Sequence, residues 1–283
     1  MVDLNFDEFI QNPTCLWDME TTKRLVEIKW SAWISAGLLS NPTEYSSAAI
    51  VSRKFELVSN RLQIEIDSPL KTYIEGFSEE HLGNFYLENG LVPLGSEEII
   101  SAKTKLENAL SLFDYSDGPL KSINLLIRSI HVVKQDDPEI DVSHSDPDIP
   151  FSIFLSVCKD ITPISNIRVA ESILHEAMHL KLTLLESIVP LVEFDIFETY
   201  YSPWRDVKRP VRGVLHGLFV FRSIVDFFKE NELIGCDDAK VRNYLDRRTA
   251  QITSEFKHLK DFHSSKGLTQ SGANLVRNLL PLN

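Results

Sequence analysis

Residues 151–189 of this 283-residue chain read FSIFLSVCKDITPISNIRVAESILHEAMHLKLTLLESIV, and this stretch decides the fold class. Its first seven residues are rich in aromatic and β-branched side chains, which is typical of a short strand. After the break at Asp160–Pro163, the pattern from about 168 to 189 indicates a helix. The stretch therefore predicts a strand followed by a long helix, in a fold that combines a sheet with helices.

Helical signals dominate on both sides of this stretch. Toward the N-terminus, apolar residues recur among charged ones at helical spacing in four segments, about 19–39, 46–59, 69–88 and 96–114. A second strand region is predicted at Ile123–Val133, and further helices at about 210–231, 238–262 and 267–280. We therefore expect an α+β, predominantly helical fold, with N-terminal helices, a small antiparallel sheet, an active-site helix and C-terminal helices.

The turn sequence YSDGP at Tyr115–Pro119 is the best candidate for a boundary. We expect residues 1–118 to form a helical region packed on the core. Residues 119–283 are expected to form the metal-binding catalytic region. No long flexible linker separates the two regions, so together they should make one compact unit.

The charge balance restricts the partners. The chain has 41 acidic and 29 basic residues and a net charge of −12, which disfavours binding to nucleic acid or to a membrane surface. Its three cysteines are widely separated and fit a reducing compartment. The N-terminal MVDLNFDEFI is acidic where a signal peptide is basic, and no apolar run reaches membrane-spanning length. We expect a soluble, cytoplasmic protein.

The predicted helix contains an HExxH motif, His175-Glu176-Ala177-Met178-His179. The two histidines differ by about 40° around a helix, so both imidazoles leave one face about one turn apart. Two nitrogens placed in this way can reach one divalent metal ion. In zinc metallopeptidases with this motif, the residue corresponding to Glu176 is the general base for a metal-bound water.

The third metal ligand decides the chemistry, and the sequence leaves it open. A metzincin site would need glycine at 182 and histidine at 185, and both positions are leucine. A carboxylate ligand of the gluzincin kind could come from one of the acids downstream, Glu193, Asp195 or Glu198. The remaining option is His216, which follows Pro210 in a segment that should begin a helix near Arg209.

Arginines accompany this histidine. Arg209, Arg212 and His216 have the i, i+3 and i+7 spacing that puts them on one helix face, where a guanidinium could bind a carboxylate. Gly213 and Gly217 leave room beside that face for another helix or a ligand. Upstream, YSPWR at 201–205 predicts an aromatic turn between helices. Its Arg205 either pairs with a nearby acid or lies near the same anion pocket.

The order of HExxH, YSPWR and RP…G…HG resembles the HExxH-type peptide-modification proteins of bacterial natural-product gene clusters. That family is associated with β-hydroxylation of ribosomally made peptides by non-haem iron and 2-oxoglutarate. The matching stretch covers about 143–231, and residues 1–118 and the last fifty carry no matching motif. The resemblance implies that His175, His179 and His216 hold Fe(II). It also implies that the 2-oxoglutarate carboxylate is bound by one of three arginines: Arg205, Arg209 or Arg212.

A three-histidine site departs from the usual non-haem iron triad, which includes a carboxylate. We nevertheless predict an Fe(II)/2-oxoglutarate oxygenase that β-hydroxylates a precursor peptide, with a separate peptide-recognition protein as a further partner. In that enzyme Glu176 would orient a ligand or contact the substrate. The alternatives are a zinc peptidase with Glu176 as base, and a metal-free peptide-binding protein. We also expect the strand Phe151–Val157 to be an edge that pairs with an extended peptide.

Overall fold

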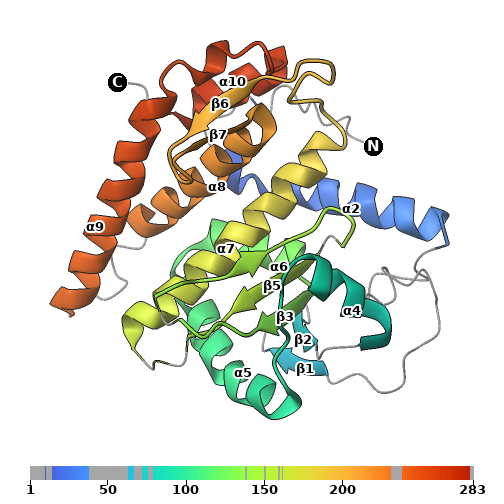
Figure 1. Cartoon of the computed structure of the whole chain (residues 1–283), viewed down its shortest axis with the longest axis vertical. Coiled ribbons are helices and arrows are strands. Elements are labelled where there is room, and N and C mark those ends of the chain that lie inside the picture. The colour runs from blue at the N-terminus through green and yellow to red at the C-terminus, as the bar shows by residue number, and fades with distance from the viewer. Residues whose placement is uncertain are drawn as a thin grey trace. The chain divides into compact units, whose positions relative to one another are not determined.

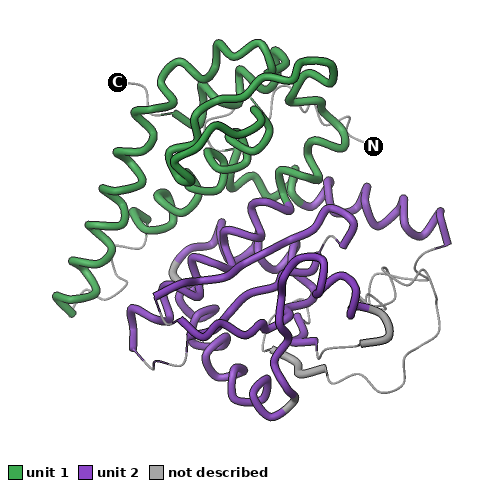
Figure 2. The backbone as a smooth tube through the Cα atoms, viewed as in Figure 1, with its two compact units in different colours: residues 1–22, 181–283 green, residues 23–180 purple. Residues whose placement is uncertain are grey.

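The computed structural model describes residues 10, 15–37, 63–66, 72–75, 79–137, 139–149, 151–158, 160, 162–230 and 238–280. The chain divides into two compact units (Figure 2). Unit 1 combines Met1–Thr22 with Lys181–Asn283, and unit 2 is the continuous segment Lys23–Leu180. This division differs from the boundary near residue 118 expected from the sequence. The YSDGP turn lies inside unit 2, where helix α6 begins at Asp117.

Unit 2 contains a five-stranded sheet in the order β1-β2-β3-β5-β4 (Figure 1). The strands are β1 Gln63–Ile66, β2 Thr72–Glu75, β3 Ser129–Val133, β4 Ser143–His144 and β5 Ser152–Ser156. Strands β2, β3 and β5 are parallel, and β1 and β4 are antiparallel to their neighbours. The sheet is therefore mixed, whereas the sequence predicted an antiparallel one. The α+β, mainly helical class is confirmed.

The expectation that Phe151–Val157 is an edge strand is wrong. Strand β5 lies between β3 and β4, and all five of its residues are buried. A strand that is covered on both faces reads as a continuous apolar run, and SIFLS has that character. The edge position belongs to β4, which follows the polar loop after β3.

The helices of unit 2 match the predicted segments in part. They are α2 Met19–Ser35, which begins in unit 1, then α4 Glu79–Glu88, α5 Ser96–Leu110 with the 3-10 turn η3 Ser111–Tyr115, α6 Asp117–Leu126 and α7 Pro163–Glu186, whose last turn from Lys181 belongs to unit 1. The predicted helix 69–88 is wrong in its first half, because Thr72–Glu75 forms β2 beside β3. The predicted strand Ile123–Val133 is helical as far as Leu126. The predicted helix 46–59 lies outside the described residues.

Unit 1 is built around α8 Val211–Glu230. Its other elements are η1 Cys15–Trp17, the hairpin β6 Thr199–Ser202 and β7 Val207–Pro210, α9 Ala239–Phe256, η4 Lys257–Leu259, η5 Phe262–Ser264 and α10 Gln270–Leu279. Helix α8 buries an apolar face whose residues include Val214, Leu215, Leu218 and Phe219. Asp238 caps α9 and Thr269 caps α10 through side-chain oxygens that accept backbone N–H groups. The three C-terminal helices predicted from the sequence are confirmed.

Lys181 anchors the N-terminal segment of unit 1. Its Nζ donates hydrogen bonds to the carbonyl oxygens of Cys15 at 3.2 Å and Leu16 at 2.6 Å. Burial lowers the pKa of this ammonium group to about 8. The described part of the chain contains no helix long and apolar enough to cross a membrane.

Candidate functional site

The two histidines of the HExxH motif converge on α7. Their Nε2 atoms lie 3.2 Å apart, and the rings meet edge to face with centroids 4.8 Å apart. Two nitrogens at this separation both lie 2.1 Å from a common point when the angle at that point is about 100°. This angle falls between the tetrahedral and octahedral values, so His175 and His179 fit a divalent metal ion.

The remaining ligands are not assembled around this pair in the described residues. No group of three or more His, Cys, Asp or Glu side chains there is arranged to hold a metal ion. His175 and His179 belong to unit 2, whereas His216 belongs to unit 1. The three-histidine site therefore stays a prediction from the sequence, and His175 and His179 are the ligands that the structure brings together.

Glu176, between the two histidines, has a different task from the one expected in a peptidase. It is 3% exposed, and each carboxylate oxygen accepts a hydrogen bond of 2.6 Å, Oε1 from Ser143 Oγ and Oε2 from Ser145 Oγ. Its Oε1 lies 3.9 Å from His175 Nε2. The carboxylate thus joins the HExxH turn of α7 to β4 and to the residue after it. The contacts of Ser143 and Ser145 with Glu176 are ones that the sequence analysis missed.

Replacing both serines with alanine is expected to destabilise unit 2 by about 3 to 5 kcal/mol, because a buried carboxylate would lose two charge-assisted hydrogen bonds. Urea unfolding followed by circular dichroism measures the loss. The same Ser143→Ala/Ser145→Ala pair in a Glu176→Gln background should cost clearly less, because the uncharged amide is less costly to bury. Equal losses in the two backgrounds would contradict the proposed contact.

In unit 1, His216 and Arg212 share one carboxylate. His216 Nε2 lies 3.0 Å from Glu186 Oε2, and the same oxygen accepts Arg212 Nε at 2.8 Å and lies 2.7 Å from Arg212 Nη2. Burial raises the pKa of Glu186, but the hydrogen bonds and charges of His216 and Arg212 outweigh it and lower the pKa overall. Arg212 and His216 do share a face of α8, and Arg212 already binds a carboxylate of the protein.

Glu186 is a third residue that the sequence analysis missed. Its Oε1 is buried and has no hydrogen-bond partner in the described residues, although Oε2 is fully engaged. The signal that could have found it is spacing, because Glu186 follows His179 by seven residues, which is close to two helical turns. Buried oxygens without partners are uncommon, so Glu186 belongs among the candidate polar residues.

The other two arginines lie on the β6–β7 hairpin. Arg205 is in its turn and Arg209 is in β7; both are exposed, and neither makes an ion pair in the described part of the chain. Pro210 ends β7 directly before α8, so the helix begins one residue later than expected. Arg209 and Arg205 keep guanidinium groups that are not committed to a described carboxylate.

Gly217 of α8 makes room for a hairpin side chain, and Gly213 lies beside another, where the sequence analysis expected another helix or a ligand. A Cβ at Gly217 would lie 2.6 Å from Cε3 and Cζ3 of Trp204, whose ring stacks on Phe221 at 4.9 Å. A Cβ at Gly213 would lie 3.4 Å from Cζ of Arg209. The YSPWR segment is therefore a strand and hairpin turn that packs on α8, and no inter-helix turn forms.

The downstream acids lie in the loop before β6, and Glu198 is the last residue of that loop. Glu193 and Asp195 are exposed, and the Glu198 carboxylate accepts Ser265 Oγ at 2.6 Å and the Gly267 N–H at 2.8 Å. These hydrogen bonds lower the pKa of Glu198. In the structure Glu198 thus links the start of the hairpin to the segment before α10.

Ser265→Ala is expected to reduce stability at pH 7, with a loss that disappears in acid. Because the folded-state pKa of Glu198 is lowered, its stabilising effect is present above the unfolded value and is lost as the pH falls through the folded value. Urea unfolding at pH 7 and near pH 3 measures this difference. Ser254→Ala, which removes a hydroxyl bonded to the Gln251 carbonyl, should have the same effect at both pH values.

No family model matches the chain, and no curated protein is similar to it at a significant level.

Proposed function

We propose that this protein is an Fe(II)- and 2-oxoglutarate-dependent oxygenase that β-hydroxylates residues of a ribosomally made precursor peptide. Two observations support a metal-dependent reaction that is not hydrolysis. The Nε2 atoms of His175 and His179 are separated by a distance that suits one divalent ion. Glu176, the expected base of a peptidase, is held by two serine hydroxyls.

The contacts of Glu176 are the observation that favours an oxygenase over a peptidase. A peptidase base must receive a proton from the attacking water, so one oxygen has to face that water. Here each oxygen already accepts one serine hydroxyl, from Ser143 or from Ser145, and the side chain is almost completely buried. Glu176 is therefore better suited to fixing the orientation of α7, which an oxygenase also needs.

In the proposed reaction one atom of O₂ enters a C–H bond of the peptide and the other enters succinate, with release of CO₂ from 2-oxoglutarate. Bound iron supplies the activation of O₂ and open positions for the keto acid. His175 and His179 hold the iron, and Glu176 with its two serines keeps those rings on a fixed turn of α7. His216 as third ligand, and Arg205 or Arg209 as the group that binds the keto acid, remain predictions from the sequence.

The test is to load the full chain with Fe(II) and 2-oxoglutarate without oxygen and to record the visible spectrum. A weak charge-transfer band is expected, because a keto acid that chelates Fe(II) absorbs in this range. The band should be absent in His179→Ala and present in Glu176→Gln. A zinc-loaded protein that cleaves peptides, with no band in the iron form and no cleavage in Glu176→Gln, would show that hydrolysis is the reaction.

A further inference from the structure

A cavity of about 460 Å³ lies in unit 2 between α5 and the ends of two strands of the sheet. Its wall includes Val133, the last residue of β3, and Val157, which directly follows β5. These strands are parallel, so their carboxyl ends meet at one edge of the sheet. Ligands of sheets with parallel strands bind outside the carboxyl ends, and the volume is in the usual range for a small-molecule site.

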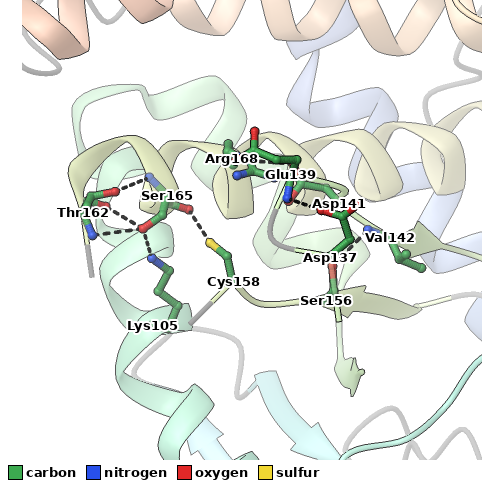
Figure 3. A network of polar contacts seen from close by, with 10 residues as sticks. All are labelled: Lys105, Asp137, Glu139, Asp141, Val142, Ser156, Cys158, Thr162, Ser165 and Arg168. Atoms are coloured by element: carbon green, nitrogen blue, oxygen red, sulfur yellow. Dashed lines mark hydrogen bonds and ion pairs between the residues drawn. The ribbon is translucent and has the colours of Figure 1, made fainter. Parts of the chain in front are cut away.

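Lys105 of α5 contributes the most unusual group in this wall. The residue is 9% exposed, and its Nζ contacts Ser165 Oγ (Figure 3). The same Nζ donates a 2.7 Å hydrogen bond to the Asp160 carbonyl oxygen. No carboxylate of the described residues lies within 4 Å of this Nζ. A buried ammonium group with neutral oxygen partners is costly, so burial disfavours the charged form of this amine.

A thiol lies beside the amine. Cys158 lines the same cavity and donates to the Ser165 carbonyl oxygen at 3.6 Å, and Ser165 Oγ is also a contact of Lys105 Nζ. Burial lowers the pKa of Lys105, and the nearby Cys158 and Asp160 oppose this effect without cancelling it. The result is an amine nucleophile with a thiol nearby at the wall of a cavity.

The rest of the wall indicates the kind of molecule that fits. Leu94, Ala102, Val133 and Val157 give it apolar surface. The Lys105 amine is also separate from the proposed metal centre. Its contact residue Ser165 precedes His175 by ten residues, which is about 15 Å along α7. An uncharged molecule with an apolar body is favoured here, since the protein as a whole is strongly acidic.

We propose that this cavity binds a small aldehyde or ketone with an apolar body and that Lys105 forms an imine with its carbonyl carbon. The amine nitrogen adds to the carbonyl carbon, and the carbonyl oxygen leaves as water with both amine protons. A C=N bond replaces the C=O bond, so the step needs no oxidant or reductant. This site is independent of the oxygenase proposal.

Two lysines of the same chain serve as internal references. Lys134 lines the same cavity but is exposed and lies 3.4 Å from an Asp136 carboxylate oxygen. Lys181 is buried with its Nζ bonded to backbone carbonyl oxygens, and it does not line this cavity. Lys105 is both buried and part of the cavity wall. Lys134 only lines the cavity, and Lys181 is only buried.

The test is to incubate the full chain with butanal and cyanoborohydride at pH 7, which reduces an imine to a stable butyl-lysine, and to map the label by mass spectrometry. We expect Lys105 to be labelled faster than Lys134, since a lowered pKa raises the neutral fraction of Lys105 whereas Lys134 lies beside a carboxylate. Lys181 should stay unlabelled. Filling the cavity in Ala102→Phe should slow labelling of Lys105 and leave Lys134 unchanged.

Comparing the labelling rates of Lys105 and Lys134 in the wild-type chain tests the proposal, so a variant that fails to fold does not prevent a conclusion. Labelling of Lys105 at the rate of Lys134 or below would overturn the proposal. Rapid labelling of Lys105 that persists in a correctly folded Ala102→Phe protein would also overturn it, because the carbonyl compound would then not enter through the cavity.

Discussion

The His179→Ala variant is expected to bind divalent metal at least about 100-fold more weakly than the wild-type chain. Loss of a group that merely orients a ligand already costs about 10- to 100-fold in metal affinity, and His179 is proposed as a direct ligand. The remaining nitrogen of His175 cannot chelate alone, although the two Nε2 atoms together fit one ion at a separation of 3.2 Å. Calorimetric titration with Co²⁺, which takes the same nitrogen ligands, measures the change.

A matched control is His263→Ala, since His263 is half-buried and its Nδ1 contacts only the Lys260 carbonyl oxygen in the described residues. This variant should bind Co²⁺ as tightly as the wild-type chain. Titration of His216→Ala in the same series tests the third ligand that the sequence predicts. Undiminished affinity in His179→Ala, with the fold intact, would rule out a metal centre at the HExxH motif.

The second large effect is expected from Gly272→Ala in the first turn of α10. A Cβ at this position would lie 2.0 Å from the carbonyl oxygen of Leu191, which is a backbone atom. That carbonyl also accepts the Thr269 N–H at 3.1 Å, and a bridge between Val192 and Leu268 holds the same two segments together. Because the backbone must shift, we expect a loss of about 3 kcal/mol, measured by chemical or thermal unfolding.

The control for this prediction is Gly213→Ala, which introduces the same methyl group into another helix of unit 1. Its Cβ would lie 3.4 Å from Cζ of Arg209, near the end of a flexible and exposed side chain that can give way. Alanine in a helix is favoured over glycine by up to about 1 kcal/mol, so this variant should be as stable as the wild-type chain or more stable. Similar losses in both variants would show that the contact with Leu191 is not the cause.

The elements that the sequence predicted well are those whose signal is local. Helix α8 begins and ends within one residue of the predicted 210–231 because its apolar positions repeat at helical spacing along twenty residues. The strand predicted at Phe151–Val157 is present because β-branched and aromatic residues suit a pleated surface. Its place in the sheet was not predictable, because a central position depends on the neighbouring strands. Strand β3 is distant in sequence, and β4 is only Ser143–His144.

The errors near the N-terminus have a similar origin. The residues around Thr72–Glu75 are compatible with a helix, so the helical spacing of α4 continues into this segment in the sequence. In the structure the segment pairs instead with Ser129 and Ile130 of β3. Tertiary pairing overrides local preference in such short segments. The predicted strand at Ile123 is helical for a related reason, since Asp117 and Pro119 begin α6, and the strand starts only at Ser129.

The candidate site shows the same limit. The spacing of His175 and His179 on one helix was sufficient to predict that their nitrogens meet, because 3.6 residues per turn fixes that geometry. The role of Glu176 was not predictable, because it depends on two serines more than thirty residues upstream. The sequence shows that a carboxylate is present, and only the fold shows what occupies its oxygens.

The two separate segments of unit 1 have a consequence for how the chain is made. Met1–Thr22 is synthesised before Lys181, whose ammonium binds the carbonyl oxygens of Cys15 and Leu16 and which follows about 160 residues later. At roughly 5–20 residues per second, the nascent N-terminal segment waits roughly 8–32 s for that lysine. The whole of Lys23–Leu180 is made during this interval and belongs to the other unit, so deleting the first segment should harm unit 1 more than unit 2.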